Sequence, residues 1–150
     1  MPSPVALIWD KQLLRPIGET ALGNPAEELK AAMVERLRAD AVFSARVDRI
    51  LATEPRDQPA AWIGATAFGA GNGAIDLIAT VHVRISTGKE AASTLIDAAW
   101  AIFAETPIVN GVSISSWRPD YHEVRLDEEH SAYHGLARFR ADARVTPSST

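Results

Sequence analysis

Cysteine is absent from the 150 residues of this chain. Its absence excludes a disulfide framework, a thiolate zinc site and a cysteine nucleophile. Long apolar runs are missing too, because no stretch approaches the roughly 20 apolar residues that a membrane-spanning helix needs. The apolar run at residues 5–9 is short and has no basic residue before it, so it does not resemble a signal peptide. We therefore expect one soluble domain that folds in the cytoplasm.

An excess of basic charge is also lacking, since the net charge is -4. Residues 120–129 account for it, with one full base, Arg125, and five acids: Asp120, Glu123, Asp127, Glu128 and Glu129. A surface that binds duplex DNA needs the opposite sign, because basic side chains must replace the phosphate counterions. The sequence therefore argues against tight nucleic-acid binding.

The first half of the chain contains clear signals for the start of a helix and for a turn. Asn24 followed by Pro25 and Glu27 predicts the start of a helix over residues 25–38, and a short helical turn is expected over residues 42–47. Strands are expected over residues 49–52, 61–68 and 75–85, the last with one apolar face and one mostly polar face. Residues 69–73, which contain Gly69, Gly71, Asn72 and Gly73, are expected to form the loop between the last two strands.

The second half repeats the order of helix and strands. Thr87 is expected to cap a second helix with Glu90 as its capping-box partner, and Pro107 should stop that helix. Strands are expected over residues 112–118 and 135–143, with the acidic segment 120–129 in a long hairpin connection. The predicted fold class is α+β, a mostly antiparallel sheet with two helices packed on one face. The predicted divisions are an arm at 1–24, a domain at 25–144 and a frayed tail at 145–150.

Residues with catalytic potential are few. His122, His130 and His134 stand close in the sequence and could hold a metal or supply a general base. Their position between two predicted strands favours a polar connection instead. The glycine loop lacks the lysine of a phosphate-binding loop, and no serine has the nucleophile-elbow pattern. We predict no catalytic, cofactor-binding or metal-binding residue and no enzyme activity, with a small metal-dependent enzyme as an alternative.

The N-terminal arm is unexpectedly apolar, with Ile8 and Trp9 as its most prominent side chains. A purely solubilising tail would be polar. We expect this arm to pack on its own domain or on a neighbouring subunit, and we favour the neighbour because the predicted domain is complete without the arm.

Four blocks, at residues 28–50, 59–64, 77–91 and 134–140, resemble in their order and spacing the tail-completion (tail-terminator) proteins of tailed phages, prophages and gene transfer agents. The resemblance covers about residues 26–144 and leaves out the arm. It implies a structural subunit of the virion that forms a hexameric ring at the head-proximal end of the tail tube. Such a ring ends tube growth and joins the tail to head-completion (stopper) proteins, after assembly in the host cytoplasm.

The resemblance also implies partners and an absence of chemistry. The expected partners are other copies of the chain, the tail-tube protein and the stopper protein, while DNA passes through without specific binding and no cofactor or membrane is involved. Another neck or tail component, such as a head-closure or tail-tube protein, is the alternative. The expected interface residues are Ile8, Trp9, Gly69, Gly71, Asn72, Gly73, Asp120, Glu123, Asp127, Glu128 and Glu129.

Overall fold

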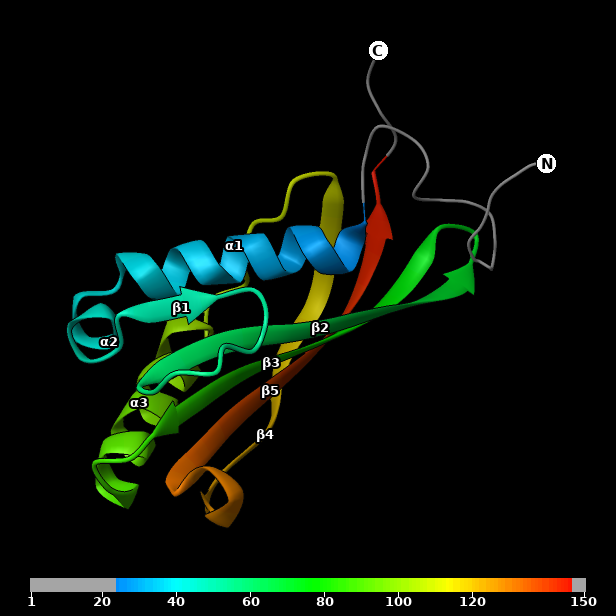
Figure 1. The fold of residues 1–150 in the computed structure, drawn as a ribbon. Helices are drawn as coiled ribbons and strands as arrows, with labels where there is room; N and C mark the ends of the chain where they lie inside the picture. Colours follow the sequence, from blue (N-terminus) through cyan, green and yellow to red (C-terminus); the bar gives the residue numbers. More distant parts are fainter. Residues whose placement is uncertain (1–23, 147–150) are drawn as a thin grey trace.

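The computed structural model describes residues 24–146, whose strands form one sheet in the order β1-β2-β3-β5-β4 (Figure 1). The predicted arm, with Ile8 and Trp9, and the end of the predicted tail lie outside the described residues. In chain order the elements are α1 (Pro25–Ala39), α2 (Ala41–Arg46), β1 (Arg49–Leu51), β2 (Ala60–Gly71), β3 (Ala74–Ile85), α3 (Lys89–Ile102), β4 (Val112–Asp127), the 3₁₀ turn η1 (Glu128–His130) and β5 (Ala132–Val145).

Helix α1 begins where the sequence predicts it. The Asn24 side chain accepts a hydrogen bond from the backbone amide of Ala26 at 2.8 Å and so satisfies a donor that the first helical turn leaves free. Leu29, Met33 and Leu37 recur at helical spacing and are fully buried. None of the described helices is long and apolar enough to cross a membrane.

The α+β class is confirmed, but the sheet is mixed. Strand β1 pairs in parallel with β2, whereas the β2–β3, β3–β5 and β4–β5 pairs are antiparallel. Three α-helices are present in the described part of the chain, where two long helices and a short helical turn were expected.

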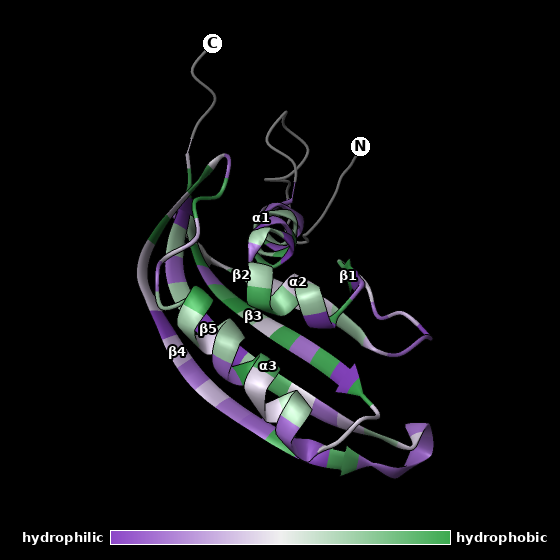
Figure 2. Ribbon diagram, turned by 90° about the vertical axis from the view of Figure 1, so that its left-hand side faces the viewer, coloured by the Kyte–Doolittle hydropathy of each residue, from purple (hydrophilic) through white to green (hydrophobic). Residues whose placement is uncertain are grey.

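The core lies on one face of the sheet. Alternate residues of β3, from Ile75 to Ile85, are buried together with Phe139 of β5. They form one hydrophobic cluster with the apolar residues of α1 and α3. Figure 2 shows the helices inside the curve of the sheet.

The glycine-rich loop is shorter than predicted. Strand β2 continues to Gly71, and the turn consists of Asn72 and Gly73, whose φ angles are 55° and 79°. Two successive positive φ angles are typical of the type I′ turns that match the twist of a hairpin. Gly69 and Gly71 therefore belong to the strand, which is irregular between them, and the prediction of a five-residue loop was wrong.

The start of α3 also differs from the prediction. Its N-cap is Gly88, with φ 147°, and no side chain caps the helix. Thr87 was therefore assigned wrongly. The buried stripe Ala92, Leu95, Ile96 and Ala99 agrees with the predicted helix.

The acidic segment is not a hairpin connection. Strand β4 runs through it to Asp127, and only η1 and Ser131 link β4 to β5. The prediction failed because β4 is an edge strand without a buried position, so its acidic half shows no alternation of apolar and polar residues. Register shifts near Ser116 and Pro119 break the pattern further.

Candidate interaction surfaces

A polar aromatic cluster occupies the sheet face opposite to the hydrophobic core. Trp62 of β2 stacks on His82 of β3, with ring centroids 4.9 Å apart and an interplanar angle of 6°. His82 Nδ1 lies 3.0 Å from Nε2 of His134 on β5. The register places these three residues on adjacent strands, so the cluster crosses the middle of the sheet.

Arg84 joins this cluster to the loop between β1 and β2. Its side chain is 2% exposed and forms an ion pair with Glu54, while Nη1 donates to the Pro55 carbonyl at 3.1 Å. The guanidinium carbon lies 4.8 Å from the Trp62 ring centroid. In the same loop, Gln58 Nε2 donates to the carbonyl of His130 at 2.8 Å. The loop thus covers this end of the outer face and closes the cluster.

The two histidines of the cluster are neutral near pH 7. Burial is the main cause that lowers the pKa of His82 to about 4, and the nearby His134 and Arg84 lower it further. The Glu54 carboxylate raises this pKa but does not offset the other effects. Burial and Arg84 also lower the pKa of His134. In a neutral pair, one ring donates to the other. Because His82 lies under Trp62 and its Nδ1 is engaged, the pair is suited to packing rather than to proton transfer near neutrality.

The three histidines predicted as a possible metal or base set do not converge. His122 meets Trp100 edge-on at 4.6 Å, His130 Nδ1 lies 2.8 Å from Asp127 Oδ2, and His134 pairs with His82. Within residues 24–146, the ligand atoms of Asp127, Glu129 and His130 lie within 4.8 Å of one another. They belong to an exposed turn, where acidic groups commonly gather without an ion.

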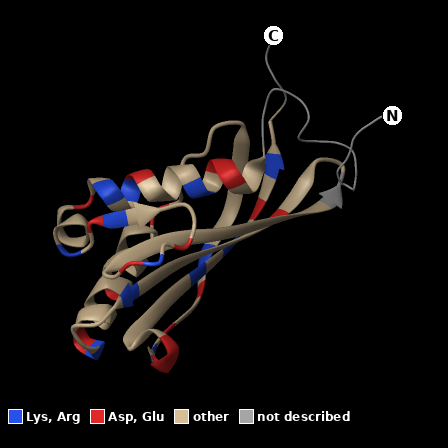
Figure 3. Ribbon diagram, in the orientation of Figure 1, with Lys and Arg blue, Asp and Glu red and all other residues tan. Residues whose placement is uncertain are grey.

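The predicted acidic interface is partly neutralised by neighbouring bases. Asp120 accepts from Arg138 Nε at 2.7 Å, and a Glu123 oxygen lies 3.3 Å from Arg125 Nε. Glu128 and Glu129 are exposed on η1, where Figure 3 shows acidic residues together. The unpaired negative charge of the segment is therefore concentrated at η1, next to the C-terminal end of β4.

Strand β4 forms a long open edge of the sheet. Its side chains include two large exposed hydrophobic residues that the sequence analysis missed, Tyr121 at 43% and Leu126 at 53%. Pro119 and the register shifts interrupt the first half of the strand, whereas pairing is regular from Tyr121 to Asp127. The sequence signal that could have identified Leu126 was its position as an apolar residue within an acidic segment. An open edge with exposed apolar side chains is suited to protein contact.

The β2–β3 hairpin extends away from the helices (Figure 1). Arg144 Nη1 donates to the carbonyl of Asn72 at 2.5 Å and ties the turn to β5. Gly69 is exposed with nothing within 4 Å of an added Cβ, and the neighbouring Phe68 is 53% exposed. The tip therefore combines a fixed backbone with an accessible aromatic ring.

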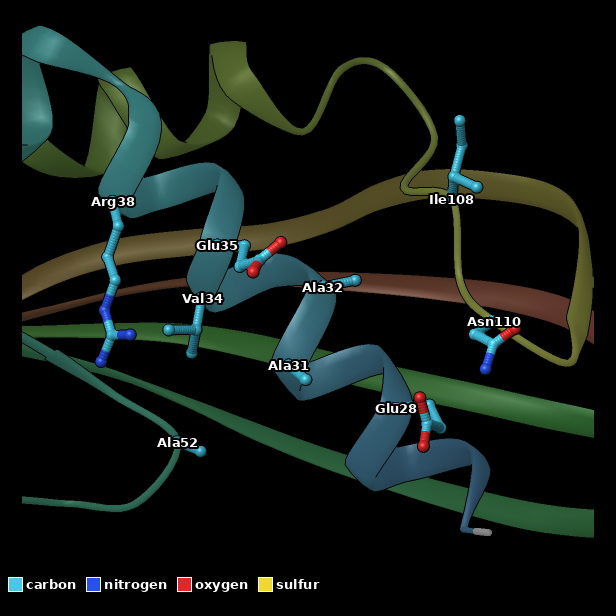
Figure 4. Close-up of a pocket in the computed structure, with 9 residues that line it drawn as sticks. All are labelled: Glu28, Ala31, Ala32, Val34, Glu35, Arg38, Ala52, Ile108 and Asn110. Atoms are coloured by element: carbon cyan, nitrogen blue, oxygen red, sulfur yellow. The ribbon is translucent and has the colours of Figure 1, made fainter. Parts of the chain in front are cut away.

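A hollow of about 520 Å³ lies between α1 and the segment that links α3 to β4 (Figure 4). Ala31, Ala32 and Val34 line it on α1, and Ile108 stands opposite with 92% of its surface exposed. A second hollow, of about 400 Å³, shares Ala32 and Ile108 with the first. Sequence reasoning did not find this surface, because its two walls are about 75 residues apart.

Comparison with known proteins identifies the fold. No family model and no curated protein sequence matches the chain. A chain of the native gene transfer agent virion superposes with a TM-score of 0.66 and 18% identity, over 79% of this chain and 96% of that one. The bacteriophage SPP1 gp17 protein superposes with a TM-score of 0.54 and 17% identity, over 91% of this chain and 99% of that one. The resemblance inferred from the sequence is thus confirmed at the level of the fold.

Proposed function

We propose that this chain is a structural component of a phage-like particle. The observation that carries the proposal is the fold, which accounts for almost the whole length of a chain in a gene transfer agent virion. The separation of His122, His130 and His134 adds support, because the alternative of a metal-dependent enzyme relied on these three histidines acting together.

The specific role that we propose is a tail terminator. Copies of the chain form a hexameric ring at the head-proximal end of the tail tube, end tube growth and join the tail to the stopper protein, while DNA passes through without specific binding. The sequence resemblance supports this role, and its four blocks contribute to α1, β1, β2, β3, α3 and β5. The particle is assembled in the host cytoplasm.

The exposed edge and the hairpin suit a ring. A ring requires a heterologous contact, in which two different patches of each subunit meet. Strand β4, with Glu123, Asp127 and the acids of η1, offers one patch, and the hairpin tip around Gly69 and Gly73 offers another. We place the subunit contacts on these two surfaces.

The experiment is removal of the gene from a particle-producing host, followed by electron microscopy of the tails. Loss of the terminator should give tails of uncontrolled length that lack heads, and the wild-type gene supplied in trans should restore normal particles. Reconstruction of the wild-type particle should show this chain in six copies at the head-proximal tail end. One copy, or a position elsewhere, would overturn the role.

Another neck or tail component remains the alternative, because the same fold observation supports it. A head-closure protein would leave tails of normal length without attached heads. A tail-tube protein would be present in many stacked copies along the tail.

A further inference from the structure

The hollow beside α1 is an apolar surface without a partner in the described part of the chain. Its floor is formed by Ala31 and Ala32, and Ile108, at 92% exposure, is the most exposed large hydrophobic residue of residues 24–146. Covering a side chain of this size stabilises a protein by about 1.5–3 kcal/mol. The surface therefore favours an occupant with apolar side chains.

The rim of the hollow carries two acids and one base, Arg38, and is therefore negative on balance. Glu28 and Glu35 both line it, and neither has an ion-pair partner among residues 24–146. The bases nearby are already engaged: Arg38 donates to the Ile50 carbonyl at 2.6 Å, and Arg36 donates to the Glu105 carbonyl at 3.0 Å. An occupant should accordingly carry basic side chains between its apolar ones.

The chain itself contains such a segment just before α1. Residues 11–17 read Lys-Gln-Leu-Leu-Arg-Pro-Ile, with two bases, no acid and three large apolar residues. We propose that this segment packs into the hollow of its own domain. Leu13, Leu14 and Ile17 would cover Ile108 and the alanines, and the two bases would face the two glutamates.

The dimensions permit this packing within one chain. The lining residues of α1 span Glu28 to Arg38, which is ~15 Å along a helix. Residues 13–17 cover a similar ~13–16 Å when extended, and residues 18–23 can bridge ~20 Å back to Asn24. The short tether also gives the segment an effective concentration of roughly 10⁻³ M at its own hollow. In dilute solution the same segment of another chain is present at a much lower concentration. Residues 5–9, with Ile8 and Trp9, then remain for a contact with another subunit.

The absence of cysteine makes a direct test simple. In the full chain, Leu14→Cys is combined with Ile108→Cys and treated with a short bis-maleimide. We expect an intramolecular cross-link, independent of protein concentration and at least about tenfold faster than in the control pair Leu14→Cys with Phe68→Cys. Phe68 is a matched control because it is exposed and lies near the hairpin tip.

Charge reversal tests the orientation of the segment. Glu28→Arg with Glu35→Arg should slow the cross-link severalfold, and Lys11→Glu with Arg15→Glu in the same chain should restore it. Equal rates in the test and control pairs would overturn the proposal. Cross-links only between copies, identified from mixed-mass dimers of ordinary and ¹⁵N-labelled chains, would overturn it in favour of a neighbour's arm. Because the monomer is measured, the result is independent of the ring.

Discussion

The charge of His82 is decided by its surroundings rather than by its type. Trp62 covers the ring, His134 holds its Nδ1, and Arg84 stands near it, so a positive charge is disfavoured. The His pair therefore contributes to packing only while it is neutral. This makes it a point where acid weakens the fold.

Stability should fall as the pH is lowered from 7 to 5. The folded pKa of His82, about 4, lies below the value of 6.5 expected for the unfolded chain. The unfolded state therefore binds the proton first, and the contribution present above pH 6.5 is progressively lost towards pH 4. We expect a decrease of about 2 kcal/mol in the free energy of unfolding between pH 7 and pH 5. Urea titrations at several pH values measure it.

The variant His82→Gln should lose most of this slope, whereas His122→Gln on β4 should retain it. The lowered pKa of His134 acts in the same direction, so a residual slope is expected in His82→Gln. A wild-type slope in that variant would show that the acid sensitivity lies elsewhere.

Gly135 shows a different residue-scale constraint. A Cβ added there would lie 2.5 Å from Ile96 Cγ1 and 3.3 Å from Val124 Cγ2. Glycine thus lets α3 approach β5 closely. Gly135→Ala should lower the free energy of unfolding by about 1–3 kcal/mol through overpacking. Gly69→Ala, with open space around it, should change stability by less than about 0.5 kcal/mol in the same denaturation experiment.

At the scale of elements, the start of α3 depends on the backbone conformation of the preceding glycine rather than on a capping side chain. Gly88 has φ 147° and ψ 164°, a region that is almost restricted to glycine. The helix then packs Leu95 and Ile96 into the core. Backbone freedom at one position thus sets how α3 meets the sheet.

Gly88→Ser should destabilise the protein by about 1–3 kcal/mol, although serine is the better N-cap residue by propensity. The matched control is Asn24→Ser at the cap of α1, where φ is -91° and a serine hydroxyl can replace the amide oxygen. That variant should remain close to wild type in thermal melts. Equal melting temperatures for both variants would contradict the role of Gly88.

At the scale of the whole molecule, exposed apolar side chains and the open edge of β4 point towards assembly. Tyr121 and Leu126 contribute nothing to the core, because both are exposed on that edge. Contact with another subunit would give them a partner and would satisfy the free backbone groups.

Leu126→Asp should leave the melting temperature of the isolated chain nearly unchanged but reduce its incorporation into particles at least about tenfold, as an interface hot spot would. Val42→Asp on α2 is the control, since Val42 is 52% exposed and distant from the β4 edge in sequence. Complementation of a deletion strain measures incorporation. Normal particle yield with Leu126→Asp would remove this part of β4 from the interface.

Much of the fold follows from local signals in the sequence. The Asn24-Pro25 start of α1 and the alternation along β3 identified these two elements, because a helix cap and one-sided burial both leave their pattern in neighbouring residues. The resemblance to virion proteins also came from order and spacing, which the fold comparison supports. Periodicity is informative wherever burial is one-sided.

Tertiary structure alone decided the remainder. The acidic half of β4 is a strand because β5 pairs with it as far as Asp127. Since this edge strand has no buried position, its sequence lacks the apolar alternation that would have indicated the pairing. The Trp62–His82–His134 cluster needs three strands in register, and the hollow beside α1 needs Ile108 to face a helix formed far earlier in the chain. The secondary-structure propensity of single residues does not indicate which distant segments come into contact, because these contacts depend on the packing of the whole domain.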